Sequence, residues 1–574
     1  MSTRQPLRGA TLIDTVVGTA LVLLIFMALV GLMHSSLLVA SLAKAKAGAT
    51  AVGDNQMEYI RSLPYDSVGT VGGIPAGAVA QNSTTTQNNI PYGVRTFVEY
   101  VDDPADGIAG ADSNGITTDY KRIKISVTYT VKGVLRELAM VSAYAPVGIE
   151  TSTNGGTLKI VVVNASGTAV PGATVRVVNA STLPSVDLTT FSDSTGVVLL
   201  GGAATSTDYQ VYVSKNGYSS AQTYARDTEN QNPTPGYLTV VKNQTTTGTF
   251  AIDVLGALTI KTYTGVTATS TTDSFNDASK IASQSGTVLL GGSLILGDDG
   301  AGGYLGDGAV RSISVAPAYL KAWTTATTSL SLPENTNIRV QVLDGNGALI
   351  PDAQIPGNSA GFNNTYIDLS GVSTSTYPSL ALRADLSSSQ SNQTPSLNLW
   401  SINALVGPIP LSAVDFTLLG AKTIGSTGAG APIYKTVVAS TTGSTGYTTA
   451  PLEWDAYALS VSGYDVIDAC DAPTYSVSPA GAYTTSLYMG PLTSNSVLVS
   501  VRDTSGAYVP GAVVTLSRTG YSATMTTSAC GTAYFGGLTS SSVYSVQISK
   551  TGYTTTSTTN VNISGHLFYA TSFP

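Results

Sequence analysis

The chain is poor in the residue types that most catalytic and metal sites require. Its 574 residues include two cysteines and two histidines, which nearly excludes Cys/His zinc sites and most histidine-based catalysis. Charged residues make up only 11% of the chain, against roughly 25% in typical soluble domains. Such a low share argues against an enzyme that handles nucleotides. The net charge is -8 and no basic run is present, so we expect no nucleic-acid binding.

What is abundant points to β-structure. Ser, Thr, Gly, Ala and Val take the place of the missing charges, which suits β-sandwiches with neutral polar surfaces. The 30 Tyr against 10 Phe favour strands with one solvent-facing side, because Tyr packs its ring and keeps its hydroxyl in water. The length is too great for one core, so several domains are expected.

One long uncharged run lies near the amino terminus. No charged residue occurs from Thr15 to Met33, and about 20 apolar residues are enough to span a bilayer. The helical pattern continues as an amphipathic stretch to Leu63, where Pro64 forbids continuation. A helix over 10–63 would be roughly 80 Å long at 1.5 Å per residue. A secretory signal or a plain single-pass anchor are the alternatives.

The segment before this run carries a family signature. A leader with Arg4 and Arg8 precedes Gly9-Ala10-Thr-Leu-Ile-Asp14, and this arrangement resembles the amino terminus of type IV prepilins and pseudopilins. The resemblance implies that prepilin peptidase removes residues 1–9 after Gly9 and that Ala10 becomes the methylated amino terminus. It also implies that Asp14, where the family usually has Glu, pairs with the terminal amine of a neighbouring subunit.

A small antiparallel sheet is predicted after the helix, over 64–148. Three strand-like stretches cover 93–101, 120–130 and 134–145, and Lys132-Gly133 forms a hairpin turn between the last two. Helix and sheet together resemble the pilin αβ-roll. We therefore expect an α+β amino-terminal pilin module followed by an all-β string of sandwich domains.

The loop between the first two of these strands is acidic. Acids spaced by turn residues can gather oxygen ligands for calcium, and some pseudopilins bind calcium in such a loop. The alternative is a solvated, turn-rich loop, in which Asp, Asn and Gly are common. The candidate calcium ligands are Asp102, Asp103, Asp106, Asp112 and Asp119.

Two later segments are copies of one module. Residues 160–218 and 499–553 share a Gly-x-x-Val-Pro-Gly-Ala turn, and the spacing from Tyr to Lys to Tyr near their ends is identical. They resemble the carboxypeptidase regulatory-like module, a seven-stranded prealbumin-like sandwich without enzymatic activity. We place these sandwiches at 157–254 and 492–574. A diverged copy is predicted at 406–491, where the opening Gly-Pro-Gly signature is lost.

A different sandwich is predicted at 256–405. Short strands at regular intervals with polar turns favour a jelly-roll or galactose-binding-like fold. Such folds often bind sugars through an aromatic ring, which makes Tyr304, Trp323 and Trp400 candidate glycan-binding residues. The alternative is that each ring packs in the core or at its rim.

The two cysteines lie in adjacent predicted modules. Outside the cell Cys470 and Cys530 can form a disulfide, and closing a loop of roughly 60 residues would stabilise the fold by about 4 kcal/mol in the entropic model. Two free buried thiols are the alternative.

The sequence therefore predicts a minor, low-copy subunit, at the tip of a type IV pilus-like filament, that displays β-modules for adhesion and is not an enzyme. Its expected partners are other pilin subunits through the helix, the prepilin peptidase, the inner-membrane assembly platform and a surface glycan or protein. It would sit in the inner membrane before assembly and in an extracellular filament afterwards, with the carboxy-terminal modules outside. Alternatives are a pseudopilin of a secretion or DNA-uptake machine, and a membrane-anchored surface enzyme or glycan-binding protein.

Overall fold

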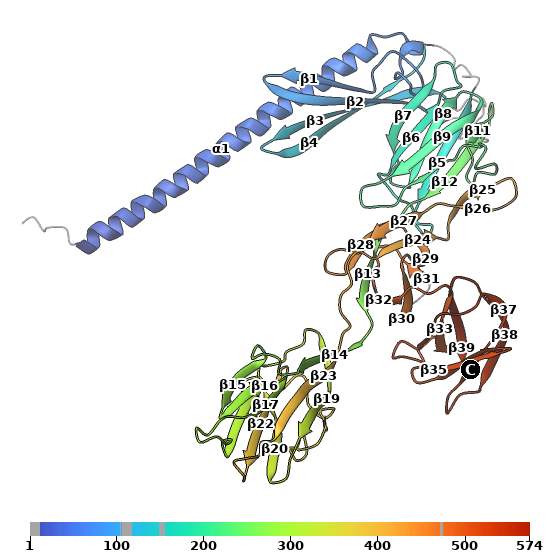
Figure 1. The fold of residues 1–574 in the computed structure, drawn as a ribbon. Helices are drawn as coiled ribbons and strands as arrows, with labels where there is room; N and C mark the ends of the chain where they lie inside the picture. The colour runs from blue at the N-terminus through green and yellow to red at the C-terminus, as the bar shows by residue number, and fades with distance from the viewer. Residues whose placement is uncertain (1–11, 104, 106–117, 148–154, 471–473, 574) are drawn as a thin grey trace, which may run out of the picture. The chain divides into compact units, whose positions relative to one another are not determined.

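A computed structural model describes residues 12–103, 105, 118–147, 155–470 and 474–573 (Figure 1). It divides into two compact units, which we describe separately. Unit 1 comprises 1–256, 422–435 and 478–480, and unit 2 comprises 257–421, 436–477 and 481–574. One long helix precedes a chain of mostly antiparallel sheets, as the sequence predicts.

The helix α1 (Leu12–Arg61) has 50 residues and is about 75 Å long at 1.5 Å per residue. It ends just before Pro64, which starts a short 3-10 helix η1 (Tyr65–Ser67). The end agrees with the prediction, because proline cannot donate the backbone hydrogen bond that the next turn needs.

The head is a four-stranded antiparallel meander in the order β1-β2-β3-β4. The three predicted strands are present, and Lys132 and Gly133 both adopt positive φ (52° and 81°) in the predicted turn. Strand β1 was not predicted, because its six residues are all polar and almost wholly exposed. The strands are β1 (Asn82–Gln87), β2 (Ile90–Val101), β3 (Tyr120–Val131) and β4 (Val134–Tyr144).

The second half of α1 packs on this sheet. Ala45, Ala49 and Ile60 are fully buried against it. Gly48 permits the close approach, since a Cβ there would lie 2.2 Å from the Tyr92 hydroxyl oxygen. That hydroxyl donates a hydrogen bond to the backbone oxygen of Ala45 at 3.0 Å.

The next domain of unit 1, module 1, is a sandwich of two sheets. One sheet has the order β12-β5-β8, with β12 parallel to β5, and the other has the order β10-β9-β6-β7, with β11 also paired to β9. A hairpin of β25 (Thr423–Ser426) and β26 (Pro432–Tyr434) also lies in unit 1, where Thr234 N donates to Ile424 O at 2.9 Å. The strands of module 1 are β5 (Gly156–Val163), β6 (Thr174–Asn179), β7 (Val186–Phe191), β8 (Val197–Ala203), β9 (Ser206–Ser214), β10 (Ala221–Gln222), β11 (Leu238–Val240) and β12 (Thr245–Ala251).

The terminal module, in unit 2, repeats this topology. Its sheets have the orders β36-β33-β39, with β33 parallel to β39, and β35-β34-β37-β38. Its strands are β33 (Ser496–Asp503), β34 (Val513–Arg518), β35 (Tyr521–Thr526), β36 (Thr532–Phe535), β37 (Ser541–Ser549), β38 (Thr556–Ile563) and β39 (His566–Phe573).

The diverged copy, module 3, begins earlier than predicted. Its sheets are β28-β13-β32-β30 and β27-β24-β29-β31, and its first strand is β13, which runs parallel to β32. We had placed β13 in the preceding sandwich, at 256–405; this boundary was wrong, because that sandwich is inserted between the first two strands of module 3. The strands are β13 (Gly256–Thr264), β24 (Asp415–Gly420), β27 (Val437–Thr441), β28 (Tyr447–Leu452), β29 (Asp455–Val461), β30 (Tyr464–Ala469), β31 (Thr474–Val477) and β32 (Ala482–Pro491).

The inserted sandwich has its own core between two sheets, in the orders β16-β17-β23-β19-β21, with β14 paired to β23, and β15-β18-β22-β20. Its strands are β14 (Thr267–Asp273), β15 (Ile281–Ser285), β16 (Thr287–Leu290), β17 (Ser293–Leu296), β18 (Asp307–Ser312), β19 (Leu320–Ser331), β20 (Thr336–Asp344), β21 (Tyr366–Asp368), β22 (Leu380–Ser388) and β23 (Ser396–Val406).

Candidate functional site: the amino-terminal helix and the module joints

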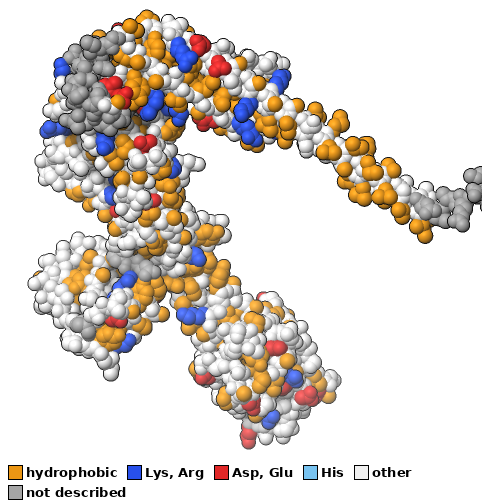
Figure 2. Space-filling model, turned by 180° about the vertical axis from the view of Figure 1, so that it is seen from behind, with side chains coloured by type: hydrophobic (Ala, Val, Ile, Leu, Met, Phe, Trp, Pro, Cys, Tyr) orange, Lys and Arg blue, Asp and Glu red, His pale blue; other side chains and the backbone are white. Residues whose placement is uncertain are grey.

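The first half of α1 leaves its apolar side chains exposed. Leu24 and Phe26 are 64% and 63% exposed, and the same holds along the helix as far as Val39. Figure 2 shows hydrophobic side chains covering this part of the helix. By length and composition it can cross a membrane, although a signal sequence would pass the same test. Exposed apolar surface on this scale needs lipid or protein to cover it.

The residues implied in processing precede this helix in the sequence. Gly9 and Ala10 lie outside the described residues. The backbone of Asp14 is helical, in the first turn of α1, but the structure does not describe its side chain. The processing and assembly roles therefore stay predictions.

Within unit 1 the head is joined to module 1 by hydrogen bonds and by shared packing. Gln81 Nε2 donates to the backbone oxygen of Asp187 at 2.7 Å, and the Arg95 guanidinium lies 4.7 Å from the centre of the Phe191 ring. Ile74, from the loop after α1, is 4% exposed and belongs to the core of module 1. Such shared packing makes this joint part of one folded body.

In module 1 and in the terminal module, a buried hydroxyl is hydrogen bonded across the turn that follows the first strand. In module 1, Ser192 Oγ donates to Val170 O at 2.7 Å and accepts from Ala173 N at 2.9 Å. In the terminal module, Thr527 Oγ1 makes the same pair of bonds to Val509 O and Ala512 N, at 2.7 and 2.8 Å. We call this arrangement the hydroxyl latch.

Module 3 keeps the latch although its sequence signature is lost. Thr442 Oγ1 donates to Leu411 O at 3.3 Å and accepts from Val414 N at 3.0 Å. Ala413 stands where module 1 has Gly172, and both have positive φ, 57° and 68°. The signature is therefore replaced by Leu-Ser-Ala-Val at 411–414, at the end of the inserted sandwich.

The inserted sandwich contains the same type of turn, which our sequence analysis missed. Asp344-Gly-Asn-Gly347 is followed by Ile350-Pro351-Asp-Ala, and Ile350 N donates to Val342 O at 3.1 Å as in the modules. Here Asn358 replaces the hydroxyl, because its Nδ2 donates to Ile350 O at 2.7 Å. The Gly-x-x-[Val/Ile]-Pro-x-Ala spacing was the available signal.

Asn358 also belongs to a Gly-x-Ser-x-Gly match, Gly357–Gly361. In serine hydrolases this pattern follows a strand and opens a helix. Here it lies in a turn region, and Ser359 Oγ donates to Asp352 Oδ2 at 2.6 Å. The match therefore lacks the structural context of a nucleophile.

Module 1, module 3 and the terminal module each contain a buried tyrosine whose hydroxyl bonds to the backbone, which we call the closing tyrosine. The hydroxyls of Tyr209, Tyr457 and Tyr544 donate to backbone oxygens a few residues upstream, at 2.8, 3.0 and 2.9 Å. All three side chains are fully buried. Burial raises the pKa of Tyr209 to about 12, because it disfavours the phenolate.

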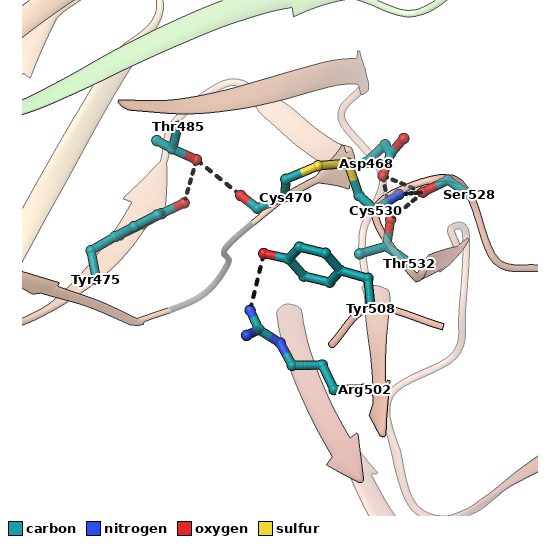
Figure 3. The surroundings of a disulfide bond; sticks show 9 residues. All are labelled: Asp468, Cys470, Tyr475, Thr485, Arg502, Tyr508, Ser528, Cys530 and Thr532. Atoms are coloured by element: carbon teal, nitrogen blue, oxygen red, sulfur yellow. Dashed lines mark hydrogen bonds between the residues drawn. A yellow bond between two sulfur atoms is a disulfide. The ribbon is translucent and has the colours of Figure 1, made fainter. Parts of the chain in front are cut away.

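A disulfide joins module 3 to the terminal module. Cys470 and Cys530 are bonded, with their Cα atoms 4.8 Å apart. Figure 3 shows the contacts on both sides of the bond: Thr485 Oγ1 donates to Cys470 O at 3.1 Å, and Ser528 Oγ donates to Asp468 Oδ1 at 2.8 Å. Thr532 also donates to Asp468 Oδ1.

A buried carboxylate lies at the same joint. The Asp465 side chain is fully buried, and its Oδ1 lies 2.8 Å from His566 Nδ1. Its Oδ2 accepts hydrogen bonds from the Tyr534 hydroxyl and from Thr493 Oγ1, the latter at 2.6 Å. Burial first, and then the hydrogen bond to Asp465, raises the pKa of Tyr534 to about 12.

This cluster does not form a Ser-His-Asp triad. Ser496 Oγ lies 3.0 Å from His566 Nδ1, the nitrogen that also faces Asp465. A triad needs the base to contact serine and carboxylate through opposite ring nitrogens. The arrangement therefore suits a structural role at this joint better than proton transfer.

The glycan-binding candidates lie in or against the core of the inserted sandwich. Trp323 and Trp400 are 1% and 2% exposed, and Trp323 Nε1 donates to Tyr377 O at 2.9 Å. Tyr304 is partly buried and packs against the same core. Assigning the two tryptophans to sugar stacking was wrong, since a buried ring cannot offer a face to a ligand; they form the core, which was the alternative.

The acidic-loop candidates are only partly described. Asp106 and Asp112 lie outside the described residues. Asp119 Oδ2 accepts a hydrogen bond from Asp103 N, and Asp103 Oδ1 accepts one from Ala105 N at 3.0 Å. Among the described residues, Asp102 included, no group of three His, Cys, Asp or Glu side chains is placed to hold a metal.

Comparison with known proteins identifies one module. Residues 496–567 match the carboxypeptidase regulatory-like domain family, which agrees with the resemblance drawn from the repeats. Module 1 shares the strand order of this terminal module. No curated protein matches the chain by sequence.

Several solved structures are similar over parts of the chain. They include the TIE protein of Bacillus anthracis (10% identity over 86% of this chain and 73% of that one, TM-score 0.16). The major pilin subunit BcpA of Bacillus cereus matches at 8% identity over 73% and 99%, with a TM-score of 0.13. The C-terminal fragment of the pilus adhesin SpaC of Lactobacillus rhamnosus GG matches at 16% identity over 28% and 88%, with a TM-score of 0.12. With TM-scores this low, we draw no conclusion about assembly from them.

Proposed function

We propose that this chain is a pilin-like surface subunit that anchors in a type IV pilus-like filament through α1 and displays its sandwiches outward for adhesion. The observation that carries the proposal is the division of α1 into two halves. Its first half is apolar and exposed, and its second half packs on a four-stranded antiparallel sheet. A helix divided in this way suits a protein that moves from a bilayer into a filament core.

A bilayer and a filament core would each cover the apolar surface of the first half of α1. A helix that is apolar all round belongs in lipid or among other apolar helices. Asp14 is the exception, because an ionised carboxylate costs several kcal/mol in lipid unless it is paired. The amine at Ala10 of a neighbouring subunit, freed when the leader is cut, would supply that partner.

The size of the exported part favours a low-copy position. Among the described residues, four sandwiches follow the head in the sequence, within 155–470 and 474–573, and a load of that size on every subunit would crowd a filament shaft. We therefore propose a minor, tip-associated subunit, with prepilin peptidase and an inner-membrane assembly platform as its partners. If purified filaments contain this chain as the major subunit, the tip assignment fails.

The test of the assembly role is Asp14→Ala, with Asp14→Glu as the matched control. We expect Asp14→Ala to insert into the membrane normally and to be lost from purified filaments, whereas Asp14→Glu is retained because it keeps the carboxylate. Membrane fractionation and immunoblotting of sheared filaments measure both steps. Normal incorporation of Asp14→Ala would leave α1 as an anchor only.

Calcium binding by the acidic loop of the head is a further part of this proposal. The motivation is the spacing of the acids from Asp102 to Asp119. Isothermal titration of calcium into the full chain in detergent tests it, with Asp119→Asn as the variant that should lose binding. Absence of binding heat at millimolar calcium would reject the site.

A further inference from the structure

Strand β30 is an addition to the regulatory-like fold. The sheet β28-β13-β32-β30 has four strands, where the corresponding sheets β8-β5-β12 and β36-β33-β39 have three. The extra strand extends the sheet of module 3 beyond β32, and it lies next to β33 and β36 of the terminal module. Its position makes it a contact element that the fold itself does not require.

The reactive and acidic groups on and just after this strand engage the terminal module. Asp465 contacts Tyr534 and His566. Asp468 accepts hydrogen bonds from Ser528 and Thr532. Cys470 follows directly and is bonded to Cys530.

Each module has a core that does not depend on this bond. The core of the terminal module is closed by its own strands, with Val499, Val514 and Ile548 among its buried residues. Module 3 has a separate core around Ile260 and Leu418. Three side chains from the terminal module, Leu498, Tyr534 and Phe568, pack against that second core.

We propose that β30 is a docking strand and that Cys470–Cys530 is a redox-controlled lock on the docked joint, rather than a staple for either fold. The matching reagent is a dithiol or a dithiol oxidoreductase. A thiolate of the dithiol attacks one protein sulfur, forms a mixed disulfide with it and releases the other protein sulfur as a thiolate, which takes up a proton. The second sulfur of the dithiol then attacks the reagent sulfur of this mixed disulfide, closes the reagent's own disulfide and releases the second protein thiol. The products are two protein thiols and the oxidised reagent, so electrons and protons balance.

Reduction then leaves a joint held only by non-covalent contacts. The two carboxylates and the apolar side chains remain in place, and the short linker 492–495 keeps the modules close. The joint opens and recloses as a local unit, while both sandwiches stay folded. Local opening of this kind appears as faster amide exchange confined to the contact surfaces.

Hydrogen–deuterium exchange of the full chain in detergent, with and without dithiothreitol, tests the proposal. We expect reduction to speed exchange about tenfold or more in β30 and β36, and to leave β34, β37 and module 1 within about twofold. The double variant Cys470→Ser/Cys530→Ser should show the open pattern without reductant and no response to it. Asp468→Asn should open the joint further only when the bond is reduced.

Two results would overturn the proposal. Faster exchange in β34 and β37 on reduction would show that the bond staples the terminal fold. Unchanged exchange in β30 and β36 would show that the bond does not control the joint. Counting alkylatable thiols before and after reduction confirms that each sample has the intended redox state.

Discussion

Module 1 and the terminal module share one topology but differ on one outer face. In both, the first strand lies between an antiparallel and a parallel neighbour. At the three aligned positions across this face, module 1 has Lys159, Leu199 and Thr247, and the terminal module has Leu498, Tyr534 and Phe568. The first set is exposed or half-exposed, and the second packs against module 3.

The comparison separates what the fold requires from what a joint requires. The inward residues, the hydroxyl latch and the closing tyrosine occur in both modules, so they belong to the fold. The outer face is free to vary, because it has no role in the core of its own module. Three side chains therefore convert a solvent-facing sheet into a docking face.

Truncation at equivalent outer positions should have the most unequal effects. Leu498→Ala removes a side chain that is 3% exposed, and we expect it to destabilise the joint by about 2–4 kcal/mol, as for buried leucines. Lys159→Ala, its counterpart in module 1, should change stability by less than about 0.5 kcal/mol. Free energies of opening, obtained from amide exchange of β33 and β5 in the full chain, measure the effects of both substitutions. Equal losses of stability would contradict the assignment of Leu498 to a joint and of Lys159 to a solvent-facing surface.

Removal of the latch hydroxyl should have similar effects in both modules. Thr527→Val and Ser192→Ala each leave a buried N–H and C=O without their partner, so we expect a loss of about 1–3 kcal/mol in the module concerned. The exposed neighbours give the controls, Thr526→Val and Ser194→Ala. Amide exchange of β34 and β6 reports the loss, and a large effect in one module alone would mean that the latch is not part of the common fold.

The smallest effect concerns the closing tyrosine. Tyr209→Phe removes one buried hydrogen bond and should cost module 1 about 1 kcal/mol at neutral pH. Because the pKa of Tyr209 is raised to about 12, the folded module holds this proton between pH 10 and 12 while the unfolded chain releases it. Stability is therefore complete below pH 10 and falls as the pH rises towards 12.

The variant Tyr209→Phe should lose this part of the alkaline fall in module 1. Tyr534 produces a similar fall at the joint, since its pKa is also raised to about 12, so the terminal module serves as an internal reference. Denaturant titrations at pH 9, 10 and 11 with module-resolved exchange compare the two. An identical fall in wild type and variant would assign the effect to other groups.

Patterns in the sequence predicted the helix, three strands of the head and two modules, because each of these patterns lies within the continuous segment that forms the element. The strand β1 lacked such a pattern, since its residues Asn82–Gln87 are all polar. The first strand of module 3 was misplaced because its partner β32 follows only after the inserted sandwich. Pairing over that distance is decided by packing, which no local pattern records.

The candidate sites also differ in whether the sequence alone could predict them. The cysteine pair was a visible candidate because the chain has only two cysteines. The contacts of Asp465 could not be predicted from the sequence, because its partners Tyr534 and His566 come from separate strands of another module. The tryptophans were assigned by residue type, and type alone does not say whether a ring faces ligand or core.

The parallel pairing of first and last strands has a mechanical consequence. In module 1, module 3 and the terminal module these strands lie side by side and point the same way, so the chain enters at one end of the module and leaves at the other. Tension along the chain therefore pulls the two strands past each other and loads their hydrogen bonds together, in shear. A string built from such units resists pulling better than one whose strands can be unzipped one bond at a time.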